Sequence, residues 1–450
     1  MSIADKLQKL IDGKQYVVDK VNAKTGSNLT IDSKWEDIGD SVENITTGLD
    51  TSDATATSND ILFGKTAYAR GEKVEGTYKA SGGSGSNLKP YLDIKKSALG
   101  LFSNFSTMTT EQLNELIKYS DTENVTNMGS MFYYCGKLTT IPQLNTSKVT
   151  NMNSMFQNCN KLTSIPLLDT SNVTSMNAMF QSCEVLTEIP QLDTSNVTDM
   201  GSTFSSCYAL TTIPLLDTSS VTNMSSMFSM NYTNSQLTEI PLLDTSKVTN
   251  MNSMFKGCRA LTTIPLLDTS NVTSMNAMFD NCRGLISIPQ LNTSNVTNMY
   301  SMFSDCNQLT EIPQLNTSKV TTMNRMFWYC SKLKTIGLLD TSSCTNMSDM
   351  FNSCAELENI SFVEETINLN LYLGSGSGTG WGDYGTKLTI DSLLSACRGM
   401  VSGKRLTVGT ANLNKLASVY VNSSGYQVEE GTEGSMLVAD YMALKSCTLA

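Results

Sequence analysis

The sequence predicts an α/β fold, a solenoid of ten coils of about 24 residues, with one short strand and one short helix in each coil. The first observation is a repeat whose phenylalanine anchors lie 24 residues apart, except for one step of 27 residues. Such a period is typical of solenoids, because a unit of that size can bury its apolar face only against its neighbours. The ten anchors are Phe132, Phe156, Phe180, Phe204, Phe228, Phe255, Phe279, Phe303, Phe327 and Phe351.

The second observation is the pattern within one repeat, for which residues 145–168 serve as the example. The apolar side chains of its first half follow the spacing of one helical face, and the polar Asn145-Thr146-Ser147 segment before them can cap a helix. The apolar stretch around Pro166 then fits a short strand, whose pairing the proline ends. The helical positions are Val149, Met152, Met155, Phe156 and Cys159, and the strand positions are Leu162, Ile165 and Leu168.

The repeat pattern Val-Thr-Asn-Met-x-x-Met-Phe-x-x-Cys-x-x-Leu-Thr-x-Ile-Pro-x-Leu-Asp-Thr-Ser resembles the BspA-like leucine-rich repeats of bacterial surface proteins and bacteriophage proteins. The resemblance extends from Val125 to about Ile360. It implies a leucine-rich-repeat solenoid that mediates adhesion or protein contact, without catalysis. Residues 387–450 look like the C-terminal cap of such proteins, and Leu406 to Ala417 fits one more degenerate coil.

The first 80 residues are predicted to form a small α+β module. Residues 1–47 fit two short capped helices, and Arg70-Gly71-Glu72 favours a turn between two short strands. So small a core is not expected to be stable alone, so the module should pack on copies of itself or on another protein. The segment Ile61-Leu62-Phe63-Gly64-Lys65-Thr66-Ala67-Tyr68 resembles a module of structural and tail proteins of bacteriophages that infect Gram-positive bacteria. That resemblance implies attachment to other virion proteins.

The composition changes along the chain indicate five parts. A Gly/Ser linker separates the N-terminal module from the rest, and a helix is expected near residues 109–117, ahead of the first full repeat. A second Gly/Ser segment, residues 374–382, is expected to be a surface loop or a hinge. The parts are the virion-attachment module (1–80), the linker (81–87), the N-terminal cap of the solenoid (88–124), the solenoid (125–360) and the C-terminal cap (361–450).

Charge and composition exclude several classes of function. The net charge is −11, only 16% of residues are charged, and no basic run occurs, so neither nucleic acid nor an anionic membrane is an expected partner. The chain has no histidine, which removes Ser-His-Asp and Cys-His catalysis and most zinc sites. We therefore expect no enzyme, no metal and no cofactor. No apolar run is long enough to span a membrane, and residues 1–21 do not fit a signal peptide.

Nine of the twelve cysteines occupy one slot of the repeat. We expect buried free thiols there, because a free cysteine behaves as a small core hydrophobe. The alternative is a ladder of disulfides between neighbouring coils, which the spacing alone permits. The two methionine rows, for example Met152 and Met155, are expected to fill the core and not to form a channel for a soft metal ion.

The leading hypothesis is a bacteriophage virion protein, a tail or baseplate appendage that presents the solenoid to the host surface. It would be assembled in the bacterial cytoplasm, where it needs no export signal, and we expect it to form a homo-oligomer. One alternative is a bacterial cell-surface adhesin, which would need an export signal. A second alternative is a head-decoration or purely structural virion protein without a receptor.

Any ligand site is expected on the outward strand positions, which form two rows. Few of these positions are charged, so a host glycan or protein is a more suitable ligand than an ion, although both rows could simply be solvated. The first row is Thr140, Ser164, Glu188, Thr212, Glu239, Thr263, Ser287, Glu311 and Thr335. The second row holds Gln143, Gln191, Gln290 and Gln314, with Leu167, Leu215, Leu242, Leu266 and Leu338 at the remaining coils.

Overall fold

The computed structural model divides the chain into two compact units, residues 1–196 and residues 197–450. It describes residues 97–449 except for 118–119, 231–234, 374–386 and 409, and the backbone of three short strands before residue 97. The two helices expected within residues 1–47, the linker and the second Gly/Ser segment therefore lie outside the described residues.

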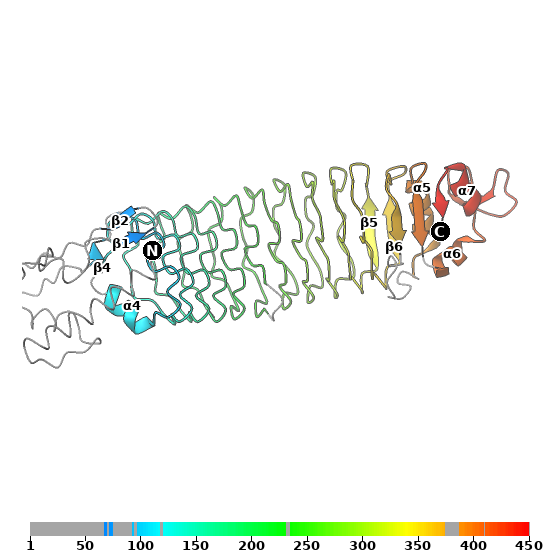
Figure 1. Cartoon of the computed structure of the whole chain (residues 1–450). Helices are drawn as coiled ribbons and strands as arrows, with labels where there is room; N and C mark the ends of the chain where they lie inside the picture. The colour runs from blue at the N-terminus through cyan, green and yellow to red at the C-terminus, as the bar shows by residue number, and fades with distance from the viewer. Residues whose placement is uncertain are drawn as a thin grey trace, which may run out of the picture. The chain divides into compact units, whose positions relative to one another are not determined.

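The first unit contains short paired strands, one helix and a series of coils (Figure 1). β1 (Ala67–Ala69) pairs antiparallel with β2 (Glu72–Val74), which confirms the predicted hairpin. β3 (Leu92–Asp93) and β4 (Ser120–Asp121) form a parallel pair. α4 (Thr110–Ile117) confirms the helix expected ahead of the first full repeat.

The coils of the first unit start earlier than the repeat pattern indicates. The backbone N–H of Phe102 donates to the carbonyl of Met131 at 2.8 Å, and the Phe102 ring stacks on the Phe132 ring with centroids 5.7 Å apart. Residues 97–105 thus form a coil that covers the first full repeat. The capping role expected of residues 88–124 stays a prediction.

The described part of the repeats contains no α-helix, so the prediction of one short helix per coil is wrong. In the repeat of Phe156, alternate backbone N–H groups have different partners. Those of Ser154 and Phe156 donate to carbonyls of the next coil at 2.8 and 2.9 Å, whereas those of Met155 and Gln157 donate three residues back, both at 3.1 Å. Ser154 also has a φ of +55°, which a right-handed helix excludes. The three-residue apolar spacing therefore comes from consecutive tight turns.

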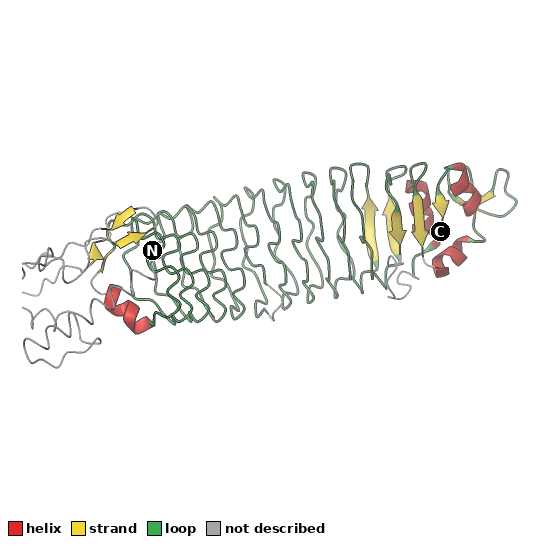
Figure 2. Cartoon of the chain, viewed as in Figure 1, coloured by secondary structure: helices red, strands yellow, loops and turns green. Residues whose placement is uncertain are grey.

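The predicted strand forms as a regular element only where its proline is missing. Among the described repeats these strands are β5 (Thr335–Leu339) and β6 (Asn359–Phe362), which pair in parallel. Their proline slots hold Gly337 and Ser361, whereas eight of the nine prolines of the chain occupy this slot in other coils. Proline has no N–H to donate to a ladder. Figure 2 accordingly shows most of the repeats as loops and turns.

The core of each unit is organised around its phenylalanine stack. In the second unit consecutive rings from Phe204 to Phe351 have centroids 5.6–5.9 Å apart and are nearly parallel. The 27-residue step from Phe228 to Phe255 does not interrupt this stack, since its rings are 5.8 Å apart. The methionine rows are buried beside the rings, which confirms their place in the core.

All twelve cysteines are buried, and none forms a disulfide. In the repeat slot, the thiol of Cys306 donates to the carbonyl of Phe279 in the preceding coil at 3.1 Å. That carbonyl also accepts the backbone N–H of Cys282 at 3.0 Å, so both of its lone pairs are used. Burial raises the pKa of the Cys258 thiol to about 12, and it raises the pKa of Cys282 and Cys306 as well.

The C-terminal part of the second unit covers the last strand of the repeats. α5 (Ile390–Gly399) places two serine hydroxyls beside β6, where Ser392 accepts the N–H of Ile360 at 3.1 Å and Ser395 accepts that of Phe362 at 2.9 Å. These hydroxyls take the place of a further paired strand, which protects an otherwise open edge.

The remaining elements form two small sheets and two helices. β7, β8 and β12 make a parallel sheet in the order β12-β8-β7, and β9 is the central strand of an antiparallel sheet in the order β10-β9-β11. The coil expected from Leu406 to Ala417 corresponds to β8 followed by α6. The bounds are β7 (Leu371–Leu373), β8 (Arg405–Val408), α6 (Thr410–Leu416), β9 (Tyr420–Val421), β10 (Gln427–Val428), β11 (Met436–Leu437), α7 (Val438–Leu444) and β12 (Thr448–Leu449).

Replacing the Phe255 ring tests its place in the core. Phe255→Ala removes a fully buried ring that stacks on both neighbours, so we expect it to lower the free energy of unfolding by about 3–5 kcal/mol. Thr263→Ala, at an exposed position of the following strand segment, is the control and should cost less than about 0.5 kcal/mol. Chemical denaturation measures both values, and equal losses would contradict the inward and outward assignment.

The buried cysteines of the repeat slot should react slowly with alkylating reagents in the folded protein. Because burial raises the thiol pKa values and each described ladder thiol donates to a carbonyl, iodoacetamide at neutral pH should leave the repeat cysteines unmodified until the protein is unfolded. Mass spectrometry of alkylated peptides measures this protection. A disulfide-linked peptide that joins Cys159 to Cys183 in a non-reducing digest would contradict the assignment.

Candidate functional site

The structure places every predicted ligand-binding residue on an outward slot of its coil. Thr140 and Ser164 are half-buried, and the other sixteen residues of the two rows are exposed. The isoleucines and leucines between them are buried, for example Ile264 and Leu267. The predicted alternation of inward and outward residues is therefore correct, and ligand binding by these residues stays a prediction.

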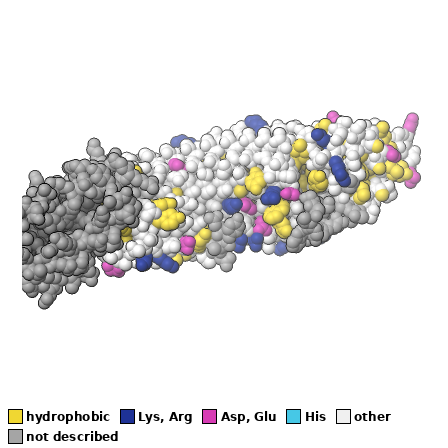
Figure 3. All heavy atoms as spheres, viewed as in Figure 1, with side chains coloured by type: hydrophobic (Ala, Val, Ile, Leu, Met, Phe, Trp, Pro, Cys, Tyr) yellow, Lys and Arg dark blue, Asp and Glu magenta, His cyan; other side chains and the backbone are white. Residues whose placement is uncertain are grey.

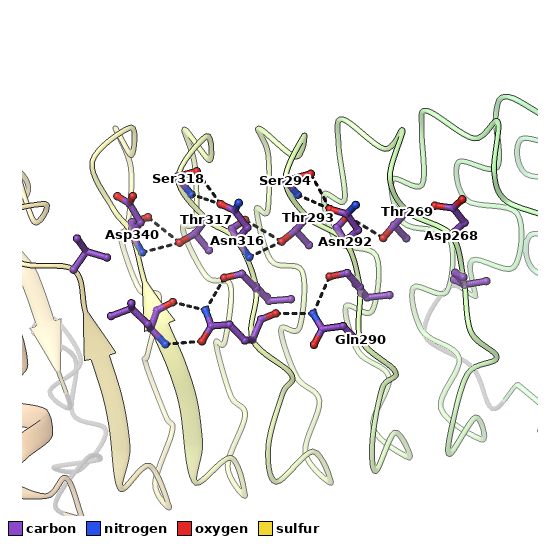
Figure 4. Close-up of a pocket in the computed structure, with 16 residues that line it drawn as sticks. Asp268, Thr269, Gln290, Asn292, Thr293, Ser294, Asn316, Thr317, Ser318 and Asp340 are labelled. Atoms are coloured by element: carbon purple, nitrogen blue, oxygen red, sulfur yellow. Dashed lines mark hydrogen bonds between the residues drawn. The ribbon is translucent and has the colours of Figure 1, made fainter.

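Two open grooves bring one of the predicted rows together with a second set of side chains. The larger groove, in the second unit, has a volume of about 930 Å³ and includes Gln290, Gln314 and Leu338 (Figure 4). A smaller groove of about 450 Å³ in the first unit includes Gln143 and Gln191. The first predicted row, from Thr140 to Thr335, lines neither groove. The residues missed by the sequence reasoning are the Asp/Asn-Thr-Ser segments that form the other side of each groove.

The glutamines of the groove also link neighbouring coils. The Nε2 group of Gln314 donates to the carbonyl of Leu315 at 2.8 Å and to that of Leu338 in the next coil at 2.7 Å. Its Oε1 accepts the N–H of Leu338 at 2.9 Å. The amide of Gln314 also lies so close to Gly337 that a side chain at that position would have to displace it, since a Cβ there would be 2.2 Å from Oε1. Gln290 makes the same donation to the carbonyl of Gln314, at 2.7 Å.

The Asp/Asn-Thr-Ser segments form Asx turns, and the helix caps predicted for them are wrong because no helix follows. The Oδ1 atom of Asn316 accepts the N–H and the hydroxyl of Ser318 at 3.1 and 2.8 Å. Asp268 accepts the N–H of Ser270 at 2.9 Å. These hydrogen bonds hold the pKa of Asp268 below its usual value, so this exposed carboxylate stays ionised near neutral pH. A repeated Asx residue followed two positions later by serine is the sequence signal that indicates such turns.

The threonine between each Asx and serine residue is buried, and in several coils its hydroxyl joins neighbouring coils, although those of Thr146 and Thr245 have no hydrogen-bond partner among the described residues. The Thr293 hydroxyl donates to the carbonyl of Asn316 and accepts the N–H of the same residue, at 2.9 and 2.8 Å. Thr317 makes the same pair of bonds to Asp340 (Figure 4). This pair of hydrogen bonds fixes the backbone of the Asx residue, whereas the outer side chains of the groove differ between coils.

The groove surface offers hydrogen-bonding groups and little charge. The Nδ2 groups of Asn292 and Asn316 and the Oε1 group of Gln290 make no hydrogen bond within the described part of the chain, so they can serve a ligand. Figure 3 shows that the visible face of the repeats consists mainly of uncharged polar side chains and backbone, with scattered charges. Among the described residues, no group of three His, Cys, Asp or Glu side chains could hold a metal ion.

The Asn-x-Thr sequences of the repeats have a structural use at the rim of the coils. The Nδ2 groups of Asn172 and Asn196 donate to the carbonyls of Ser147 and Ser171, both at 2.8 Å. In the second unit Asn295 donates to Ser270 at 2.9 Å. These amides therefore serve as links between coils.

Within the described residues, no helix combines the length and apolar character required to cross a membrane.

Comparison with known families identifies the repeats. A family model described as "Mycoplasma protein of unknown function, DUF285" matches residues 100–212, 182–283 and 262–362, which together cover more than half of the chain. Comparison with curated proteins gives no match.

Several solved structures resemble the chain at low sequence identity. A leucine-rich cell surface protein from Faecalibacterium prausnitzii is 22% identical, with 53% of this chain and 77% of that chain covered and a TM-score of 0.29. A leucine-rich repeat protein from Eubacterium ventriosum is 18% identical, with coverage of 52% and 81% and a TM-score of 0.31. One from Bacteroides ovatus is 17% identical, with coverage of 62% and 84% and a TM-score of 0.22. These TM-scores are low, so the neighbours establish no function for this chain.

The hydrogen bonds of the Gln314 side chain to the next coil should contribute to the stability of the protein. Gln314→Ala removes three hydrogen bonds, two of which join neighbouring coils, so we expect the free energy of unfolding to fall by about 1–2 kcal/mol. Glu311→Ala, at an exposed position of the same coil, is the matched control and should have less than about half that effect. Denaturation followed by circular dichroism measures both variants. An unchanged Gln314→Ala protein would show that the amide is only a surface group.

Proposed function

The chain belongs to the DUF285 family, and from this premise we propose that it is a surface-displayed recognition protein whose repeats bind a partner without catalysis. The observation that carries the proposal is that each coil has slots with a structural role and outward slots that vary. The phenylalanine, cysteine and threonine slots are fixed by packing and by hydrogen bonds to the neighbouring coil. The outward slots vary between coils, which is the arrangement expected of a scaffold that presents a binding surface.

We propose a bacteriophage virion as the setting, with residues 1–80 attached to other virion proteins and the repeats available to a host glycan or protein. The support is the resemblance of residues 61–68 to a phage structural module, together with the hairpin that β1 and β2 form within residues 1–80. Attachment as an oligomer would give several copies of the repeats on one particle. Several weak contacts could then act together, which raises the strength of host binding.

A second candidate setting is the surface of a bacterium or a mycoplasma, where the same repeats would act as an adhesin. The description of the family as mycoplasma proteins favours this setting. A structural virion protein without a receptor is the third candidate.

The location of the protein decides between these settings. We expect mass spectrometry and immunogold electron microscopy to find the full-length protein on purified virions, at the tail or baseplate. Deletion of residues 1–80 should abolish incorporation while circular dichroism of the repeats stays the same. Labelling of intact, uninfected cells by the antibody would instead support the adhesin. Wild-type particles that adsorb to host cells no better than particles without the protein would contradict the recognition role.

A further inference from the structure

The exposed row after each proline changes its chemistry along the second unit. Three consecutive coils carry leucine, and the next two carry glutamine. Leu215, Leu242 and Leu266 are 66%, 67% and 66% exposed. Two residues further along the same coils, aspartate accompanies leucine and asparagine accompanies glutamine at 290 and 314. The apolar–acidic stripe is defined by Leu215, Asp217, Leu242, Asp244, Leu266 and Asp268.

The fold does not require leucine in this stripe. Where the slot holds Gln290 or Gln314, the side chain donates to a carbonyl of the next coil. Leucine cannot make that bond, and the carbonyls of Leu242 and Leu266 accept no hydrogen bond from the described part of the chain. An exposed leucine in this slot therefore lacks a stabilising bond and also leaves apolar surface in water.

The fold does not require aspartate in the stripe either. Asn292 and Asn316 make the same Asx turns with neutral amides. The carboxylates of Asp244 and Asp268 repel each other, which opposes the effect of their hydrogen bonds on the pKa of Asp268. Lys247 lies near Asp244 and helps to keep its pKa low, but neither carboxylate is in a salt bridge among the described residues. The stripe thus combines three adjacent exposed leucines with the carboxylates of Asp244 and Asp268, neither of which is in a salt bridge among the described residues.

From these observations we propose that the stripe binds an amphipathic, basic α-helix of a partner protein. Apolar side chains of such a helix would cover the leucines, and its lysines or arginines would face the aspartates. The inference rests on the proposed recognition role and specifies the partner for one face of the second unit.

The spacing of the coils favours a helix over an extended peptide. Neighbouring coils are joined next to the stripe, where the Ile286 N–H donates to the carbonyl of Thr262 at 2.9 Å, and β5 and β6 pair in parallel at the equivalent slot of Leu338, so equivalent residues on that side are about 4.8 Å apart. One helical turn advances about 5.4 Å, which places about one turn over each coil. In an extended peptide laid along the stripe, side chains of one face would be about 6.8 Å apart and would lose register with the leucines. Contiguous exposed apolar surface bordered by polar groups is typical of interaction sites.

The neighbouring coils supply conservative variants for the test. Leu215→Gln/Leu242→Gln/Leu266→Gln and Asp217→Asn/Asp244→Asn/Asp268→Asn introduce side chains that the same slots already hold at positions 290 to 316. Both variants should therefore fold, as circular dichroism and thermal unfolding would verify. The reverse change, Gln290→Leu/Asn292→Asp, lengthens the stripe by one coil.

The probe is a fluorescein-labelled synthetic helical peptide of about four turns, with leucines along one face and lysines beside them. Fluorescence anisotropy with the full-length protein measures its affinity. We expect the triple leucine variant to bind at least about tenfold more weakly. The triple aspartate variant should bind about threefold to tenfold more weakly and show less dependence on salt. The lengthened stripe should bind a peptide with one further turn more tightly than wild type does.

Two control peptides separate stripe binding from non-specific attraction. One has the same composition in shuffled order, and the other has glutamate in place of lysine. The proposal is overturned if wild type binds the shuffled peptide equally well, or if the triple leucine variant retains wild-type affinity. Binding of purified bacterial polysaccharide that requires the leucines, without peptide binding, would overturn it in favour of a glycan. A protein that promotes host adsorption but rejects the peptide contradicts the stripe alone, whereas one that binds the peptide but never contributes to adsorption contradicts the proposed function alone.

Discussion

The structure depends on how each coil divides its backbone N–H groups. In the turn region, alternate groups close tight turns within the coil or reach a carbonyl of the next coil, as Met155 and Phe156 illustrate. This alternation satisfies the backbone without a helix and fixes the rotation of one coil relative to the next. Identical residues consequently meet, so the phenylalanine rings stack and thiols such as those of Cys282 and Cys306 reach a phenylalanine carbonyl of the preceding coil. Equivalent exposed side chains of neighbouring coils therefore lie next to one another.

Proline gives the repeats a second constraint on the opposite side of the coil. It removes an N–H where a β-ladder would otherwise form, and regular strands appear where Gly337 and Ser361 replace it. The glutamine side chain after the proline supplies part of what is lost, since its amide reaches the next coil. Exchanging the side chain at this slot costs little stability, whereas changing the backbone there would disrupt the contacts between coils. The slot is therefore well suited to variation in binding chemistry, and the leucine and glutamine coils are two outcomes of that freedom.

Much of this organisation could be predicted from the sequence, because it depends on period and polarity. The phenylalanine anchors, the buried cysteines and the outward position of residues such as Thr263 all follow from the repeat. The helix could not be tested locally, because the spacing of Met152, Met155 and Cys159 fits both a helical face and a series of turns. The hydrogen-bond partner of the Ser154 N–H distinguishes a helix from a series of turns, and that partner is in another coil. The Asx segments were misassigned for the same reason, since a cap and an Asx turn use the same side-chain oxygens.

α5 has a consequence for the state of the protein in solution. Without Ser392 and Ser395, the N–H groups of Ile360 and Phe362 in β6 would face outward as a ready template for a strand from another molecule. Chains that present such a template can add to one another without limit and form fibres. By occupying these donors, two hydroxyl groups prevent growth at the end of the last coil. The length of the coil stack at this end is thus set by the chain itself and not by its concentration.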